Sequence, residues 1–311
     1  MVDNVANSRI IGSMAKELPA SEREFYSLQS RFSDPGSSAR IYADVASDIG
    51  EIARVVRNVV LHREDADRHG VVLSGDRKNE ATSRYVAKIL EHITDLRSGS
   101  LVEARPPAAR FAGVCRDFAI LTTSILRYHR APARLRCGFA AYFTPGFYED
   151  HWVGEYWKPG TGWTLVDAEL GDDQVEKNDI TFDPLDIPRD QFVVGGDAWA
   201  RCRSGKDVGE HFGVGVIALS GTWFVANDVV RDLAAVNSVE VLPWDEWGVA
   251  EKPFDHLSVS ELHLFDEVAQ LEIWGGSLSE IQALFNGHSE LRVPDAVRSH
   301  TTYGGVHLVS L

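Results

Sequence analysis

Three side chains suited to nucleophilic catalysis follow one another in the middle of this 311-residue chain: Cys115, His151 and Asp167. A thiol attacks as the thiolate, an imidazole can take the thiol proton and return it to a leaving group, and a carboxylate can hold that imidazole in one orientation. A buried cysteine is more often a small apolar residue of the core. The elements around the three residues decide between these two interpretations.

The predicted secondary structure gives each of the three residues a defined place. An apolar run over residues 116–128 predicts a buried helix, so Cys115 lies where a loop enters a helix, and a helix N-terminus favours the thiolate. His151 begins one predicted strand, and Asp167 lies near the end of the next. The connection WKPGTGW between them predicts a tight hairpin, which makes these two strand ends neighbours. We therefore expect the imidazole and the carboxylate to lie side by side.

The remaining patterns place this unit inside a larger α+β chain. Period-two alternation predicts strands over 133–143, 151–157 and 162–170. Helical spacing of apolar residues predicts helices over 46–62, 83–99, 189–205, 227–239, 258–271 and 277–288. Residues 1–45 are expected to form a weakly structured lead-in or a short helical hairpin. We expect a core of helices packed on an antiparallel sheet over 46–182, and a mainly helical extension over 183–311 packed on that core.

The motifs around the three residues resemble the transglutaminase-like superfamily. The matching segments run in order from about residue 111 to 170: GVCRDFA, LR with APAR, GF, DHWV, and GW with VDA. The resemblance implies a papain-like fold in which Cys115, His151 and Asp167 form a catalytic triad. It also implies thiol acyl chemistry on amides through a thioester, with water as acceptor in a peptidase or amidase and an amine as acceptor in acyl transfer. It does not extend past residue 183, so protein cross-linking is not the default inference.

Residues beside the triad are candidates for contact with a substrate. Asp150 and Trp152 flank His151, and Arg116 follows Cys115, so these three flanking side chains are predicted to bind substrate. The backbone N–H of Cys115 is predicted to donate to an oxyanion, as is usual for a nucleophile at a helix start. Glu155 shares a strand face with the histidine and would need a partner if it is buried.

The other two cysteines are predicted to pack rather than react. Cys137 lies on the apolar face of an alternating strand, and Cys202 lies in a predicted helix. A zinc site built from Cys115, His129, Cys137 and His151 fits by residue type, but the spacings match no compact zinc module. The sequence shows neither a phosphate loop nor a complete dinucleotide fingerprint. It therefore predicts no metal and no cofactor.

The composition disfavours several other classes of protein. Hydrophobic residues make up 44% and charged residues 25%, which is typical of a folded chain. The formal net charge of −15 predicts no nucleic-acid partner and no binding to anionic membranes. The chain shows no apolar run of membrane-spanning length, and its N-terminal stretch lacks a secretory pattern. Three cysteines without a Cys-x-x-Cys pair fit a reducing compartment, so we expect a cytoplasmic protein.

These patterns favour a cysteine-dependent amide hydrolase or acyltransferase that acts through a thioester on Cys115, with His151 as base and acid and Asp167 orienting it. The expected partners are a peptide, amide or thioester substrate and, for acyl transfer, an amine acceptor. The sequence carries no indication of oligomeric state. Two alternatives stay open: a biosynthetic enzyme that forms amides on a small amine, and a non-catalytic binding module on the same scaffold.

Overall fold

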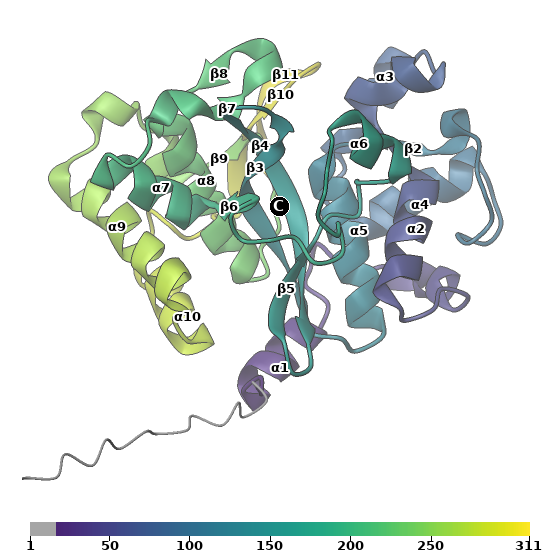
Figure 1. The fold of residues 1–311 in the computed structure, drawn as a ribbon, viewed down its shortest axis with the longest axis horizontal. Helices are drawn as coiled ribbons and strands as arrows, with labels where there is room; N and C mark the ends of the chain where they lie inside the picture. The colour runs from purple at the N-terminus through teal and green to yellow at the C-terminus, as the bar shows by residue number, and fades with distance from the viewer. Residues whose placement is uncertain (1–16) are drawn as a thin grey trace, which may run out of the picture.

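Two long antiparallel strands form the centre of the fold (Figure 1). The computed structural model describes residues 17–311, and in it β3 (Ala133–Thr144) pairs with β4 (Phe147–Lys158). The strands of this sheet follow the order β6-β3-β4-β7-β8, and β5 (Gly162–Val166) pairs with the second half of β4. Part of the predicted lead-in lies outside the described residues.

Helices lie in two groups to either side of the sheet in Figure 1. The first group contains α2 (Ile49–Val59), α3 (Gly75–Lys78), α4 (Val86–Leu96), α5 (Cys115–Tyr128) and α6 (Asp172–Lys177), and the second contains α7 (Gly195–Ser204), α8 (Thr222–Val236), α9 (Val259–Trp274) and α10 (Leu278–Gly287). One hydrophobic core joins α2 and α5 to β3 and to α8. Helix α1 (Ala20–Ser27) packs near β5 through the ring of Tyr26. The predicted α+β class, with helices packed on an antiparallel sheet, is confirmed. None of the described helices is long and apolar enough to cross a membrane.

Helix α5 begins at Cys115 because the residues around its first turn cap it. The carboxylate of Asp117, the third helical residue, accepts a hydrogen bond from the N–H of Val114 at 2.9 Å. All the side chains from Arg116 to Arg127 are buried, which explains the dense apolar run in the sequence. The cap and the buried face together fix where the helix begins, and therefore fix the position of the cysteine.

Several short strands were missed by the sequence analysis. They are β1 (Val60–His62), β2 (Phe111–Gly113), β6 (Phe192–Val194), β7 (Phe212–Val214), β8 (Leu219–Ser220), β9 (Asp245–Glu246), β10 (Ala296–Thr301) and β11 (Gly305–Ser310). All of these except β10 and β11 are two or three residues long, which is too short for an alternating pattern to be recognised. At Gly213, φ is +154° and a Cβ would lie 2.0 Å from the carbonyl oxygen of Leu219, so only glycine lets β7 and β8 meet. The segment after residue 183 thus contributes strands β6, β7 and β8 to the central sheet in addition to its helices.

Glu155 is fully buried in β4 and has the partners that its burial requires. Its carboxylate accepts from Arg134 at 2.6 Å, lies 3.4 Å from Arg136, and also pairs with Arg189. Burial alone would raise the pKa of this carboxyl, but the three guanidinium groups hold it well below its usual range. The expectation that Glu155 needs a partner is confirmed.

Replacing Glu155 by alanine is expected to lower the free energy of unfolding by about 3–5 kcal/mol, because buried guanidinium groups lose their counter-charge. A depressed pKa also means that this stabilisation is lost as pH falls below the ordinary glutamate pKa of about 4.3. Urea unfolding at pH 7 measures the loss. Glu51→Ala, which removes a partly exposed pair with Arg54, is the matched control and should cost less than about 1 kcal/mol. Equal losses in the two variants would contradict the interpretation.

Candidate active site

The fold brings the three predicted triad residues together. His151 lies in β4, Asp167 directly follows β5, and the β4–β5 pairing sets Gly154 opposite Val166, so the two side chains become diagonal neighbours. The imidazole Nε2 of His151 lies 2.8 Å from Oδ2 of Asp167. The thiol of Cys115, at the start of α5, lies close enough to the imidazole for each group to influence the pKa of the other. The predicted hairpin geometry is confirmed.

Both oxygens of the Asp167 carboxylate are occupied. Oδ1 accepts the backbone N–H of Glu169 at 2.9 Å, and Oδ2 accepts the hydroxyl of Tyr142 at 2.8 Å as well as the bond from the imidazole. The segment itself is held by the bond from the Asp167 N–H to the carbonyl of Pro184 and by Arg57, which donates to the carbonyl of Ala168 at 3.2 Å. The carboxylate therefore presents one oxygen to the histidine in a fixed position.

Tyr142 is a site residue that the sequence analysis missed. The alternation of the strand pointed to it: Tyr142 is an even number of residues from Gly138 in β3, and Gly138 is paired with His151. However, the predicted β4 began at residue 151, whereas the observed strand begins at residue 147 and its pairing with β3 shifts register between Ala140 and Thr144. The neighbour of the carboxylate could therefore not be placed from the pattern alone.

The imidazole of His151 is buried, whereas Cys115 as a whole residue keeps some exposure. His151 is 4% exposed and Asp167 is 2% exposed, whereas Cys115 is only half-buried. The ring of Phe143 packs against the imidazole with centroids 5.0 Å apart in a T-shaped contact. The arrangement shields the imidazole from solvent.

The charge of Asp167 governs the protonation of the Cys115–His151 pair. Burial by itself lowers the pKa of His151, but Asp167 and the thiol together raise it well above its ordinary value. For Cys115, burial raises the pKa of the thiol above its ordinary value, although the hydrogen bond and charge of His151 act to lower it. The positive end of α5 also favours a thiolate and the two groups titrate as a pair, so we expect the proton of Cys115 to be shared with His151 near neutral pH despite the burial.

Glu169 forms a second titratable group beside the triad. Its Oε2 is buried without a hydrogen-bond partner among the described residues, and burial raises its pKa. It lines a cavity of about 60 Å³ together with His62, Asp65 and Phe118, the last of which lies one turn after the cysteine on α5. Glu169 also lies within metal-ligand reach of two groups, His62 with Asp65 and His151 with Asp167. The zinc set considered from the sequence is not assembled, since His129 is bonded to the carbonyl of Val45.

Two of the three flanking residues predicted to bind substrate are wholly buried. Arg116 is 0% exposed, and its guanidinium donates to the carbonyl of Arg84 at 2.7 Å and pairs with Asp117. Trp152 is 1% exposed and belongs to the main core. Neither side chain is exposed to solvent in this conformation, so the substrate contact predicted for them remains a prediction. Trp152 lies beside His151 in the sequence but on the other face of β4, because neighbours on a strand point to opposite faces.

Asp150, the third flanking residue, is half-buried beside the carboxyl group of Asp228. The carboxylates of Asp150 and Asp228 and the thiol of Cys137 bring their polar atoms within 4.8 Å of one another. Asp228 is fully buried and bonded to Arg231 at 2.9 Å, while Asp150 Oδ1 and Asp228 Oδ2 have no partner among the described residues. Burial raises the pKa of Asp150 to about 6, against the influence of Arg231 and His151. Two carboxyl groups this close together oppose each other's ionisation.

Replacing Asp150 by asparagine is expected to stabilise the protein at alkaline pH. A carboxyl whose pKa is higher in the folded than in the unfolded chain favours folding at low pH and opposes it as pH rises from about 4 to about 6. The variant should gain about 1–2 kcal/mol in free energy of unfolding at pH 8. Its free energy of unfolding should also change less steeply with pH between about 4 and about 6 than that of the wild type. Thermal unfolding across this range tests it against the exposed control Asp95→Asn. If the free energy of unfolding of Asp150→Asn changes with pH as steeply as that of the wild type, the raised pKa of Asp150 is contradicted.

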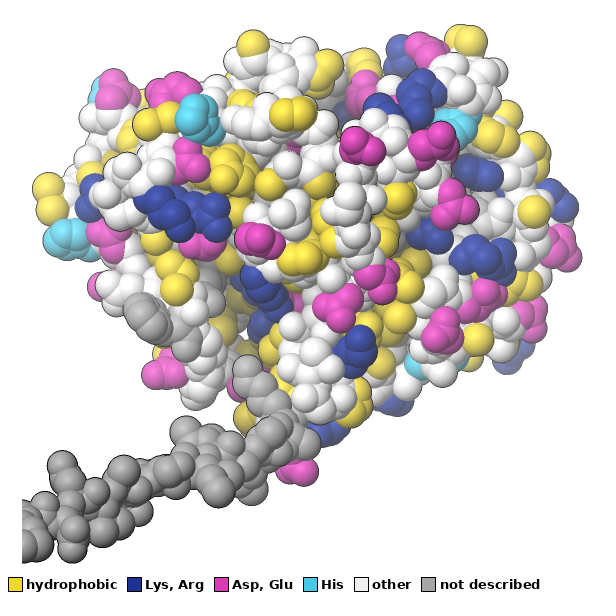
Figure 2. All heavy atoms as spheres, viewed as in Figure 1, with side chains coloured by type: hydrophobic (Ala, Val, Ile, Leu, Met, Phe, Trp, Pro, Cys, Tyr) yellow, Lys and Arg dark blue, Asp and Glu magenta, His cyan; other side chains and the backbone are white. Residues whose placement is uncertain are grey.

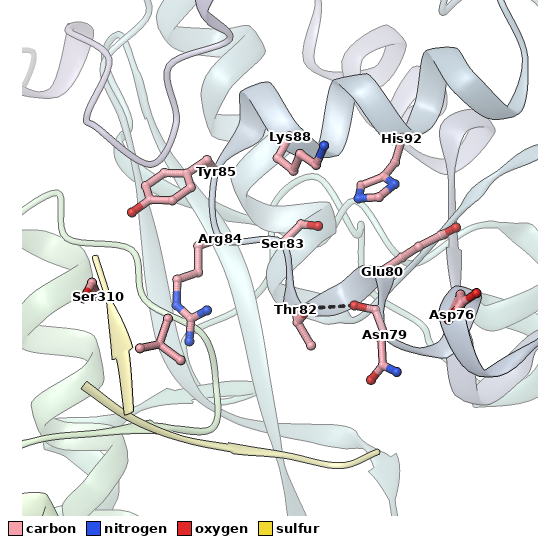
Figure 3. Close-up of a pocket in the computed structure, with 11 residues that line it drawn as sticks. Asp76, Asn79, Glu80, Thr82, Ser83, Arg84, Tyr85, Lys88, His92 and Ser310 are labelled. Carbon is pink, nitrogen blue, oxygen red and sulfur yellow. Dashed lines mark hydrogen bonds between the residues drawn. The ribbon is translucent and has the colours of Figure 1, made fainter. Parts of the chain in front are cut away.

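Larger cavities lie at other places on the molecule. One of about 420 Å³ opens between the start of α4 and β11, where Arg84, Lys88 and His92 line it opposite Ser310 (Figure 3). Another, of about 290 Å³, is lined by Tyr142 and Phe143, both of which contact the imidazole of His151. Acidic and basic side chains are interspersed on the face in Figure 2, so the negative net charge is not gathered into one patch there.

The central part of the chain is similar to a known protein family. Residues 75–168 match the family model of the transglutaminase-like superfamily, and this range contains Cys115, His151 and Asp167. No curated protein matches the chain. The chain is also similar to the crystal structure of a candidate cysteine protease from Cytophaga hutchinsonii, at 20% identity and a TM-score of 0.33. That match covers 57% of this chain and 47% of the other, so the chain spans about half the length of the matched protein.

Proposed function

We propose that this chain, whose residues 75–168 form a transglutaminase-like domain, is a cysteine-dependent amide hydrolase or acyltransferase. The observation that carries the proposal is the hydrogen bond between the imidazole of His151 and Asp167, with the thiol of Cys115 beside the same imidazole at the N-terminus of α5. A thiol, a base and a residue that orients the base are the parts that thiol acyl chemistry needs. The proposed substrates are peptides, amides or thioesters.

The proposed reaction begins when the proton of Cys115 passes to Nδ1 of His151, since Nε2 faces Asp167. The thiolate attacks the acyl carbon, and the carbonyl electrons move to oxygen. The first N–H groups of α5, including that of Cys115, have no partner within the helix and can donate to this oxyanion. Collapse breaks the bond to the leaving group, which takes the proton from the imidazolium, and a thioester remains on the cysteine.

The second half of the proposed reaction runs through the same groups. Water or an amine attacks the thioester, His151 removes its proton, and the thiolate of Cys115 leaves. Asp167 keeps the imidazole in the tautomer that both halves require and stabilises its protonated form. Water as acceptor gives hydrolysis, and an amine gives acyl transfer or amide formation.

The proposal is tested by trapping the acyl-enzyme. With p-nitrophenyl acetate as the acyl donor we expect a burst of p-nitrophenolate and an acetyl group on Cys115, located by peptide mass spectrometry. Adding hydroxylamine or glycine methyl ester after the burst shows whether an amine competes with water for the thioester. A burst of the same size in Cys115→Ala, or none in the wild type, would favour a binding module over an enzyme.

A further inference from the structure

We infer that Tyr142 is a positioning residue of the triad, whose phenol hydroxyl fixes the oxygen of Asp167 that holds His151. The inference rests on the proposed function, because it assigns a role within the same site. Tyr142 is not expected to contact the substrate carbonyl or the thiol. It acts on the reaction through the carboxylate.

The contacts of Asp167 show why this hydroxyl matters. Tyr142 and the imidazole both bond Oδ2, each at 2.8 Å, and the backbone N–H of Glu169 bonds Oδ1 at 2.9 Å. A carboxylate oxygen accepts about two hydrogen bonds, so Oδ2 is saturated by these two donors. Without the phenol, only one bond to each oxygen would resist rotation of the carboxylate. Tyr142 therefore contributes a third point of attachment.

The phenol is itself held rigidly. Tyr142 lies in β3, is 8% exposed, and packs its ring against Phe143 with centroids 4.7 Å apart and against Phe182 at 5.4 Å. Its ring also meets the imidazole at right angles, with centroids 6.0 Å apart. Burial, with the charge of Asp167, raises the pKa of Tyr142 well above its ordinary value, so the hydroxyl stays protonated and remains a donor. The donor is thus available in one place over the working range of pH.

The hydroxyl is expected to act on the proton balance as well as on the geometry. A donor to Oδ2 spreads the negative charge of Asp167 and weakens its pull on the imidazolium proton. Removing the donor leaves a stronger acceptor for His151, so the pKa of the imidazole rises further. An imidazolium that holds its proton more tightly returns it more slowly to the leaving group. A purely structural tyrosine would change neither quantity.

Tyr142→Phe tests the inference, because it deletes the hydroxyl and keeps the ring packing. We expect acylation by p-nitroacetanilide, whose amine leaving group must take a proton from the imidazolium, to fall about 10-fold, a part of the roughly 10²–10⁴-fold that general acid–base assistance supplies. We expect the alkaline limb of its pH profile, and the imidazole titration of His151 by NMR, to move up by about half a pH unit or more. The control is Tyr156→Phe on the neighbouring strand, whose hydroxyl has no hydrogen bond with the described residues; it should match the wild type.

The outcomes separate this inference from the proposed function. If the wild type shows a burst and Tyr142→Phe has the same rate and pH profile, the positioning role is wrong and the enzyme proposal stands. If the wild type shows no burst, both are wrong. A measurement on the unaltered tyrosine covers the case in which the variant does not fold: a slowly exchanging Tyr142 hydroxyl proton should be visible by NMR and disappear in Asp167→Asn. No such proton in the wild type would overturn the inference.

Discussion

Cys115→Ala is expected to abolish the burst of p-nitrophenolate and to lower acylation by at least about 10³-fold, because the remaining residues then have no nucleophile to activate. The loss should come without unfolding. Cys115 is only half-buried at a helix start, and alanine is the best helix former, so the melting temperature should stay close to that of the wild type.

Cys137→Ala is the matched control. It should keep the burst of p-nitrophenolate and lower the stability of the protein. Cys137 is 0% exposed and belongs to the main core, so removing its sulfur leaves a small cavity that costs about 1 kcal/mol. Its thiol pKa is raised well above the ordinary value by burial, so it contributes no nucleophile near neutral pH. A burst that survives in Cys115→Ala and disappears in Cys137→Ala would contradict the assignment.

Asp167→Asn is expected to lower acylation by about 10²–10⁴-fold while leaving the fold intact. The carboxylate accepts the Nε2–H of His151 and so leaves Nδ1 free to take the thiol proton. An asparagine can offer its amide N–H to Nε2 instead, which moves the imidazole proton to Nδ1 and blocks it as a base. Loss of the negative charge also removes the main cause of the raised pKa of His151, so the imidazolium form should disappear at lower pH than in the wild type.

The control for this variant is Asp186→Asn, which changes an exposed aspartate that pairs with Lys158 at 3.4 Å. It should leave acylation and the His151 titration unchanged. If Asp167→Asn acylates at the wild-type rate, the carboxylate does not orient the base. If both variants slow acylation equally, the effect is one of general charge and not of the triad.

The parts of the site that could be predicted were those encoded locally. Cys115 stands before a long apolar run, and His151 and Asp167 stand on two strands joined by a short hairpin, so spacing alone brought them together. The family motifs lie in the same segment, and the family match over 75–168 confirms the resemblance.

The parts that could not be predicted depend on contacts between distant segments. Tyr142 reaches Asp167 only because β3 and β4 shift register between Ala140 and Thr144. Arg116 is buried because Arg84, from a loop far earlier in the chain, supplies a carbonyl to its guanidinium. A charged residue beside a nucleophile suggests a site mouth in the sequence, and only the packed structure shows it satisfied in the interior.

The segment after residue 183 also takes its structure from the core rather than from its own pattern. The three residues of β6 pair with β3 over Gly138–Ala140, and β7 pairs in parallel with β4 at Tyr148 and Glu149. Such short strands have no stability of their own and need an existing edge to pair with. The boundary at 183 therefore remains a prediction.

The pH dependence of alkylation by iodoacetamide tests the proposed nucleophile most directly, because it needs no knowledge of the substrate. We predict fast labelling of Cys115 alone, with an apparent pKa well below the ordinary value of about 8.5 that rises in His151→Ala. Cys137 and Cys202 serve as internal controls, since burial raises the thiol pKa of Cys202 to about 11 and that of Cys137 well above its usual value. Slow labelling of Cys115 with an ordinary pKa in both proteins would contradict a thiolate activated by His151.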